Sequence, residues 1–347
     1  MHIHYITGSI DGCSLVQCYI PAKYLSRLPG VKATVSSRPE FIEDKDLHDA
    51  DVVILQRQIR NSVFQYMKKH KSDKLFIYDL DDALWLIPPD FPTKKFWPDR
   101  KLKLVEIFIK ECKFVTVHSE GVYVNLKERF PDINVYLLPP LVDFERAISK
   151  RRPNREEIRV GWQGSVSHVK MSEHVAHAVA QVVRGEPRVR AVWMGFLPTP
   201  IKRLPWWQWE YYDWVSIDNF YEVLGALDLD IGLAPLQPSK FSATRTVRKL
   251  LDYGMFGIPV IATDTPPFST YAKDVFYPVD PSNKLNKWRR AIFDMVANER
   301  LRQEFSEKIL SFAKQFDAKE RIAEWLEVYK EIQRRAHEEA KKQKSSS

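Results

Sequence analysis

Short apolar strands alternate with amphipathic helices along almost the whole sequence, and this alternation constrains the fold more than any other feature. In the first half, strands and helices are expected in turn over residues 2–6, 15–28, 51–56, 62–70, 75–78, 100–111, 114–117, 119–130 and 134–137. A strand–helix–strand order is typical of a parallel sheet with helices on both faces. The sequence therefore predicts an α/β fold, with a Rossmann-like domain over residues 1–148.

A polar interruption at residues 149–157 indicates a linker between two domains. Its sequence, SKRRPNREE, places four cations around Pro153, a composition that suits an exposed connection. The alternation then restarts, with elements expected over 158–162, 171–184, 189–194, 221–226, 229–234, 244–256, 259–263, 283–298 and 299–315. A chain of 347 residues is long enough for two domains. We expect a second Rossmann-like domain over 158–316.

The last part of the chain predicts one long helix. Asp317 suits its N-cap, and the helix is expected over 317–340, followed by a frayed tail over 341–347. Five apolar side chains share one face of this helix: Ile322, Trp325, Leu326, Tyr329 and Ile332. We expect that face to pack at the domain junction.

Composition argues against several other classes of protein. No apolar run approaches the roughly 18 residues that span a bilayer, and no secretory leader opens the chain. The three cysteines have no C-x-x-C spacing, which argues against a disulfide framework and a zinc site. A glycine turn with Gly8 and Ser9 follows the first strand, but it lacks the G-x-G-x-x-G fingerprint, so a dehydrogenase is disfavoured. We expect a soluble, cytoplasmic protein.

The segment from 228 to 264 carries the strongest chemical signal. It reads strand, loop, helix, strand, and on the helix Arg245, Lys249 and Asp252 are spaced to share the face opposite the apolar one. The N-terminus of a helix with two cations suits a diphosphate, and a carboxylate two turns on could accept hydrogen bonds from ribose. An ordinary solvent-facing helix with a Lys249–Asp252 pair fits the spacing equally well.

The same segment resembles the donor site of the large retaining glycosyltransferase family that has two Rossmann-like domains, the GT-B fold. The family motif F-N-x-x-K-S-x-x-K-x-x-E-Y is matched in register by Phe241, Arg245, Thr246, Lys249, Asp252 and Tyr253, and G-x-P-V-I-A follows at 257–262. The resemblance implies that Arg245 and Lys249 bind the donor diphosphate and Asp252 the ribose, with Thr246 as a further donor-binding residue. Asp252 replaces the usual glutamate, and Thr244 stands where many members have another glutamate that contacts the sugar. The identity of the sugar therefore stays open.

Two further blocks resemble the same family. IRVGWQGSVSH (158–168) is similar to its strand and glycine turn, and VWMGFLP (192–198) to its strand beside the nucleotide base. The resemblance adds four donor-binding candidates: Gln163, Gly164, Ser165 and Gly195. It implies a nucleotide-diphosphate sugar as donor, with a UDP-sugar favoured, retention of the anomeric configuration and no required cofactor.

Three carboxylates follow the buried strand at 75–78 and form the leading catalytic candidates. Asp79, Asp81 and Asp82 end that strand, where ligands bind in open α/β sheets, and similar D-D-x-x-W turns occur in the family. They could orient the acceptor hydroxyl, act as general base or hold a metal, while N-capping is the structural alternative. We expect no metal, because Arg245 and Lys249 would already neutralise the leaving diphosphate.

His118, at the end of the strand 114–117, is a further catalytic candidate. It follows a strand whose carboxyl end is also expected to face the cleft. A hydrogen-bonded structural histidine is the alternative.

The acceptor depends on a basic, aromatic stretch in the first domain. Between Arg60 and Lys113 there are 12 Lys or Arg against 8 Asp or Glu, and the acceptor-binding candidates are Lys94, Lys95, Phe96, Trp97 and Arg100. Such a stretch could grip phosphates and stack a flipped base, or lie on an anionic bilayer beside a lipid-linked sugar. The family includes phage-encoded members that glycosylate hydroxymethylated pyrimidines. Double-stranded DNA is the favoured acceptor, a surface polysaccharide or lipid-linked glycan the alternative, and a sugar-nucleotide 2-epimerase of the same fold a further one.

Overall fold

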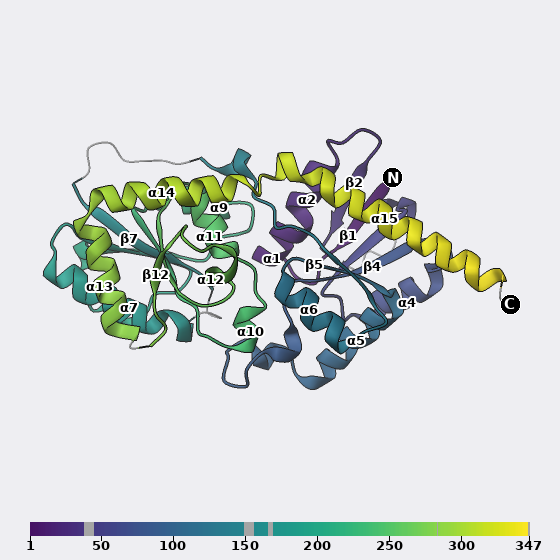
Figure 1. Ribbon diagram of the computed structural model, residues 1–347, viewed down its shortest axis with the longest axis horizontal. Helices are drawn as coiled ribbons and strands as arrows, with labels where there is room; N and C mark the ends of the chain where they lie inside the picture. Colours follow the sequence, from purple (N-terminus) through teal and green to yellow (C-terminus); the bar gives the residue numbers. More distant parts are fainter. Residues whose placement is uncertain (38–44, 149–155, 166–168, 283, 346–347) are drawn as a thin grey trace.

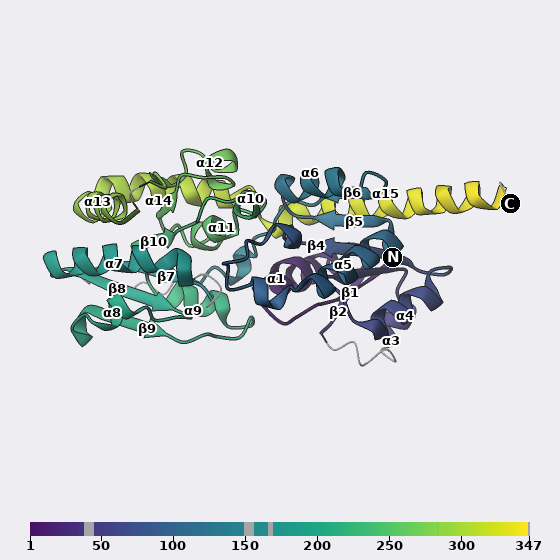
Figure 2. The same cartoon turned by 90° about the horizontal axis from the view of Figure 1, so that it is seen from below.

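The computed structural model describes residues 1–37, 45–148, 156–165, 169–282 and 284–345, which form two lobes placed one beside the other (Figures 1 and 2). The first lobe contains a six-stranded parallel sheet in the order β2-β1-β3-β4-β5-β6. Its strands are β1 (His2–Ile6), β2 (Lys32–Ser36), β3 (Val52–Gln56), β4 (Leu75–Leu80), β5 (Phe114–Val117) and β6 (Asn134–Leu137). The predicted α/β character of this half is confirmed.

The second lobe contains another six-stranded parallel sheet, in the order β12-β11-β10-β7-β8-β9. Its strands are β7 (Ile158–Gln163), β8 (Val189–Met194), β9 (Trp209–Tyr212), β10 (Ile231–Ala234), β11 (Val260–Thr263) and β12 (Tyr277–Val279). The sequence predicted neither β2, β9 nor β12. All three lie at or next to a sheet edge, where half-exposed side chains weaken the apolar signal.

The helices of the first lobe lie close to the predicted positions, except α3, which was not predicted. They are α1 (Gly12–Ser14), α2 (Ile20–Leu25), α3 (Lys45–Asp49), α4 (Asn61–His70), α5 (Asp99–Cys112) and α6 (Glu120–Arg129). A π-helical stretch, Leu15–Tyr19, joins α1 to α2, so the helix expected over 15–28 runs from 12 to 25. In α5 the side chains of Val105, Phe108, Ile109 and Cys112 recur at helical spacing and are buried, which fixes the helix on the sheet.

The helices of the second lobe include one correction that matters for the site. They are α7 (Val169–Gly185), α8 (Thr199–Lys202), α9 (Phe220–Ala226), α10 (Lys240–Ala243), α11 (Arg248–Gly254), α12 (Phe268–Tyr271), α13 (Lys284–Ala297) and α14 (Glu299–Lys314). The single helix expected over 244–256 is wrong, because the chain forms α10, a loop and then α11. Arg245 therefore lies in a loop and does not share a helix face with Lys249.

The chain returns to the first lobe before its last helix, α15 (Ala318–Ser345), which lies along that lobe (Figure 1). The return is fixed where Val142 donates to Phe316 and accepts from Ala318 through backbone hydrogen bonds of 2.8 and 2.9 Å. The helix continues to Ser345, where the sequence predicted a tail from 341. Residues 149–155 of the expected linker lie outside the described residues.

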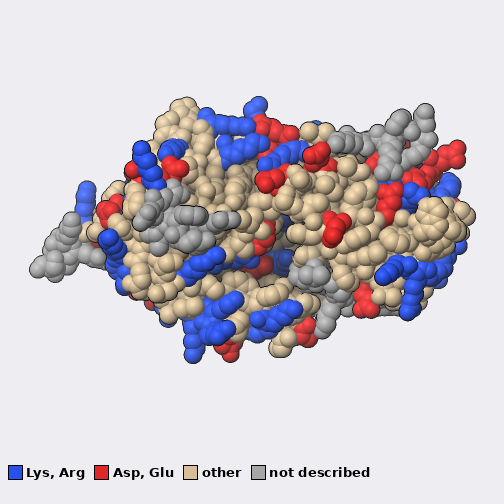
Figure 3. Space-filling view, turned by 180° about the vertical axis from the view of Figure 1, so that it is seen from behind, with Lys and Arg blue, Asp and Glu red and all other residues tan. Residues whose placement is uncertain are grey.

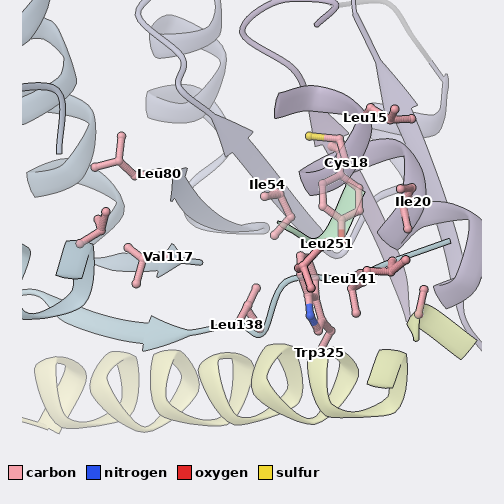
Figure 4. Packing of buried hydrophobic residues seen from close by; sticks show 14 of the residues in the cluster. Leu15, Cys18, Ile20, Ile54, Leu80, Val117, Leu138, Leu141, Leu251 and Trp325 are labelled. Carbon is pink, nitrogen blue, oxygen red and sulfur yellow. The ribbon is translucent and has the colours of Figure 1, made fainter. Parts of the chain in front are cut away.

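The apolar face of α15 packs mainly on the first lobe and only at its beginning on the junction. Trp325 lies among Leu138 and Leu141, which follow β6, and Leu251 of α11 (Figure 4). Its indole Nε1 donates to the carbonyl of Pro139 over 3.0 Å. The helix thereby joins the cores of the two lobes, but most of its length lies beyond the junction where the sequence placed it.

Candidate functional site between the two lobes

The two lobes face each other across a hollow that contains both acidic and basic side chains (Figure 3). Asp82, just after β4, comes within 3.7 Å of Arg245, which lies in the loop after β10 and α10. The carboxyl ends of both sheets therefore point into the same space, as they do where open α/β sheets bind ligands.

On the second lobe, two glycines let the ends of β7 and β8 approach each other closely. The amide of Gly164 donates to the carbonyl of Met194 over 3.1 Å, and Gly195 has a positive φ of 91°. A Cβ atom on Gly195 would lie 2.4 Å from the carbonyl oxygen of Gly164, so a larger residue would need the backbone to move. The structure thus brings together Gln163, Gly164 and Gly195, with Ser165 half-buried beside them.

Lys249, in the first turn of α11, reaches the backbone beside Gly164. Its Nζ donates to the carbonyl of Gln163 and lies 5.1 Å from the centroid of the Trp162 ring. Burial lowers the pKa of Lys249 to about 7, against the opposing effect of Asp252. An anion bound here would favour the charged ammonium, so the position suits a ligand that brings negative charge.

Arg245 points across the hollow towards the first lobe. Its Nε lies 3.7 Å from Oδ1 of Asp82, and its guanidinium lies 5.8 Å from the centroid of Phe241. Thr246 follows in the same loop and is half-buried. The two cations predicted to bind a diphosphate are therefore held by different elements, Lys249 by a helix and Arg245 by a loop.

Asp252 does not lie on an exposed helix face, so this expectation is wrong. Only 6% of the residue is exposed, and its Oδ1 accepts from Nε of Arg248 over 2.8 Å and from the hydroxyl of Tyr221 over 3.3 Å. Arg248 also donates to the carbonyl of Leu141 over 2.6 Å. Because Arg248 contacts Leu141 in the segment that leaves the first lobe, the Arg248–Asp252 side of α11 faces the junction. The ribose contact of Asp252 stays a prediction.

Arg248 and Tyr221 were missed as parts of the site. Their signal in the sequence is slight: Arg248 stands four residues before Asp252, a spacing that pairs opposite charges on a helix. Nothing in the sequence pattern relates Tyr221 to either of them.

On the first lobe, Asp79 and His118 form a buried hydrogen-bonded pair. Oδ2 of Asp79 accepts from Oγ1 of Thr116 over 2.7 Å and interacts with Nε2 of His118 at 2.8 Å. Asp79 is 1% and His118 5% exposed, and the imidazole packs 5.3 Å from the Trp325 ring. These are the contacts expected of a structural histidine, while the catalytic role of both residues stays a prediction.

Asp81 and Asp82 lie closer to the open space than Asp79. Oδ2 of Asp81 is 3.4 Å from Nη1 of Arg57, whereas its buried Oδ1 has no hydrogen-bond partner among the described residues. Burial raises the pKa of Asp82 to about 6, although Arg245 acts in the opposite direction. Asp82 therefore has a raised pKa and lies next to Arg245.

Arg57 links the glycine turn after β1 to Asp81, because its guanidinium lies near Asp11 of the turn and near Asp81. Arg57 was not singled out from the sequence. Gly8 donates its amide to Oε1 of Gln56 over 2.9 Å, and Ser9 donates to Oδ2 of Asp11 over 2.6 Å. Nη2 of Arg57 lies 3.1 Å from the same Asp11 oxygen, and Arg57 has a positive φ of 47°. This unusual backbone conformation directs the guanidinium between two carboxylates.

The basic stretch predicted to bind the acceptor lies on the surface of the first lobe. Lys94–Phe96 form a short 3₁₀ helix, Phe96 is 56% exposed, and Nζ of Lys95 lies 5.1 Å from its ring. Trp97 is half-buried, and Arg100 is exposed at the start of α5. The nearby Phe91 packs against Phe241 at 5.9 Å, so the stretch adjoins the rim of the hollow.

Within the described ranges, no three His, Cys, Asp or Glu side chains gather closely enough to hold a metal ion. Nor, in the same part of the chain, is any helix both long and apolar enough to cross a membrane.

Comparison with known proteins gives a match in structure and none in sequence. No protein-family model matches the chain, and no curated protein matches it either. A glycosyltransferase from Rickettsia africae ESF-5 aligns with a TM-score of 0.66 and 15% identity, over 95% of this chain and 98% of that one. Anabaena Alr3699/HepE, solved with UDP and glucose, gives 0.66 and 13% over 94% and 99%. Sucrose-phosphate synthase from Thermosynechococcus elongatus gives 0.71 and 10% over 96% and 99%. The chain therefore has the GT-B fold, which it shares over nearly its whole length with these glycosyltransferases.

Proposed function

We propose that this protein is a glycosyltransferase that moves a sugar from a UDP-sugar to an acceptor hydroxyl. One observation carries the proposal: in a GT-B fold, Lys249 reaches the Gln163 carbonyl at the end of β7 while Arg245 stands opposite Asp82. UDP as the nucleotide is supported by the structurally similar HepE, which was solved with UDP and with UDP-glucose.

On the donor side, Lys249 and Arg245 neutralise the charge of the diphosphate. The bond from the sugar C1 to the phosphate oxygen breaks in the reaction, so negative charge grows on the leaving UDP. Cations fixed beside that oxygen stabilise the transition state more than the ground state.

On the acceptor side, Asp81 and Asp82 receive the hydroxyl that attacks C1. The new C1–O bond forms as UDP leaves, and the hydroxyl proton passes to a phosphate oxygen or to the ionised carboxylate of Asp82. Retention of the anomeric configuration is supported by the resemblance of residues 241–253 to the retaining family. The anomeric proton coupling in the NMR spectrum of the product tests it.

Replacing Asp82 with asparagine should lower kcat about tenfold and leave the affinity for UDP almost unchanged. The effect is smaller than the loss of a full general base, because a phosphate oxygen can still accept the proton. In the wild type, the acid limb of the rate profile should lie near pH 6, where the carboxylate of Asp82 becomes protonated. Asp132→Asn, at an exposed position remote from the hollow, is the control. An unchanged acid limb in Asp82→Asn would remove Asp82 from the mechanism.

For the acceptor we propose hydroxymethylated pyrimidine in double-stranded DNA. The support is the exposed Lys95, Phe96 and Arg100 beside the rim, which can bind phosphates and a base, while the uncharged hydroxymethyl group suits the acidic interior. The double variant Lys95→Ala/Arg100→Ala should weaken DNA binding a few-fold and reduce the slope of log K against log salt by about two. A salt slope equal to that of the wild type would argue for a glycan acceptor instead.

The deciding experiment is a donor screen with released UDP as the readout. UDP-sugars are incubated with hydroxymethylated DNA, with plain DNA and without acceptor. UDP release that requires hydroxymethylated DNA supports the full proposal. Conversion of the donor to an isomer without acceptor identifies an epimerase, and absence of both reactions with every UDP-sugar contradicts the proposed function.

A further inference from the structure

Three consecutive residues at the start of α6 contact the opposite lobe, and two of them, Ser119 and Gly121, contact the turn formed by residues 241–245. Ser119 caps α6 by accepting from the amide of Val122 over 3.1 Å, and its hydroxyl donates to the carbonyl of Thr244 over 2.5 Å. The next residue, Glu120, accepts from the hydroxyl of Tyr271 over 3.1 Å. Both Ser119 and Thr244 are buried, so the hydrogen bond between the lobes is shielded from water.

Gly121 makes the closest of these approaches. A Cβ atom at this position would lie 2.6 Å from Cα of Thr244 and 2.8 Å from the carbonyl oxygen of Ala243. Both are backbone atoms, which cannot turn aside as the end of a flexible side chain can. The two lobes can therefore close to this distance only because residue 121 has no side chain.

The loop that is held in this way carries Arg245. Thr244 donates through its amide and its hydroxyl to the carbonyl of Phe241, over 3.1 and 2.8 Å, and the amide of Arg245 donates to Ser242 over 3.2 Å. These bonds make residues 241–245 a compact turn. A displacement of Thr244 must then move the backbone of Arg245 with it, together with the guanidinium that faces Asp82.

We propose that Ser119 and Gly121 are positioning residues of the first lobe that set the place of Arg245, so that the donor site is complete only when the lobes are closed. The inference rests on the proposed function for the role of Arg245, but the contact itself is independent of the substrate. It assigns to the first lobe an indirect part in binding the donor diphosphate, through the position of Arg245.

The first test is Gly121→Ala, with Gly185→Ala as its matched control. Alanine is the better helix former at both places, and a Cβ on Gly185 meets nothing within 4 Å. Gly121→Ala should raise the KM for the UDP-sugar and the Kd for UDP about tenfold, because a shift of the order of 1 Å suffices to disturb a bound diphosphate. Its Tm should stay close to that of the control, since the clash lies between the lobes and not within one.

The second test separates the hydrogen bond to Thr244 from the capping of α6. Ser119→Ala removes both, whereas Ser119→Thr keeps a hydroxyl that can cap the helix and donate. Ser119→Ala should weaken UDP binding several-fold, and Ser119→Thr should restore it. Equal UDP affinity in wild type, Gly121→Ala and Ser119→Ala would overturn the proposal.

A third measurement makes no use of the nucleotide. Small-angle X-ray scattering should give a larger radius of gyration for Gly121→Ala than for wild type and Gly185→Ala. If the radius increases while the wild type uses no UDP-sugar, only the proposed function fails. If the wild type transfers sugar while Gly121→Ala keeps both the wild-type radius and the wild-type KM, only the positioning role fails.

Discussion

Replacing Arg245 with alanine is expected to reduce kcat/KM for the UDP-sugar by about 10²- to 10³-fold. The guanidinium lies beside Asp82 at 3.7 Å, on the acceptor side of the place where the leaving diphosphate would develop charge. Removing it takes away a cation whose interaction strengthens as the bond to the sugar breaks. KM should rise and kcat should fall, because the guanidinium binds the donor diphosphate in the ground state and binds it more strongly as charge develops on the leaving group.

The stability of Arg245→Ala should stay close to that of the wild type. Its ion pair with Asp82 joins two partly exposed side chains, and such pairs add little to the free energy of unfolding. Lys240→Ala is the matched control, since Lys240 is an exposed cation in the same turn. Steady-state kinetics and a thermal melt measure the two effects. Wild-type turnover in Arg245→Ala would remove the donor site from residues 241–253.

The second large effect is expected for Lys249→Met, which should weaken UDP binding by about 10²-fold without lowering the Tm. Nζ of Lys249 donates to the carbonyl of Gln163 next to Gly164. A diphosphate bound at this place would form a charge-assisted hydrogen bond with the ammonium group. Methionine keeps an unbranched apolar chain against the Trp162 ring and avoids the burial of an ammonium group. A residue that is essential for binding but not for stability is the pattern expected of a functional cation.

The pH dependence of Lys249 gives an independent check. Its pKa of about 7 in the folded protein lies below the value of 10.5 in the unfolded chain, so the unfolded chain binds more protons between these values. The contribution of Lys249 to stability therefore rises as the pH increases from about 7 towards 10.5. Lys249→Met should lose this rise, whereas Lys240→Met should keep it.

Donor affinity should change with pH in the opposite direction. A diphosphate favours the charged ammonium, so UDP binding takes up a proton above about pH 7, and the affinity for UDP should fall by up to about tenfold per pH unit. Calorimetry in two buffers of different ionisation enthalpy measures the proton uptake. Binding of UDP that is independent of pH from 7 to 9, or equal in Lys249→Met, would contradict the assignment.

Local sequence patterns were sufficient to predict the α/β architecture, whereas the donor candidates came from the resemblance to a family and stay predictions. The alternation of periods near 2 and 3.6 in apolar residues located most strands and helices, because each element buries one face in its own sheet. The same local logic located Lys249 in a helix and the carboxylates Asp81 and Asp82 at the end of a strand. The sequence pattern was wrong at Arg245, because it predicted a helix from residue 244 where the chain forms a loop. Ser119 of the first lobe donates a hydrogen bond to this loop at Thr244.

The tertiary structure decided how the candidate residues are used. Asp252 is paired with Arg248 and Tyr221 and not exposed, and His118 is packed between Asp79 and Trp325. Each of these arrangements includes residues far apart in the chain, such as Trp325 beside His118, so no spacing within a segment encodes it. The sequence by itself determined which elements form and which side chains end them. Only the packing of the whole chain determined the partners of these side chains, their burial and hence their pKa, because these depend on atoms brought next to them from elsewhere in the chain.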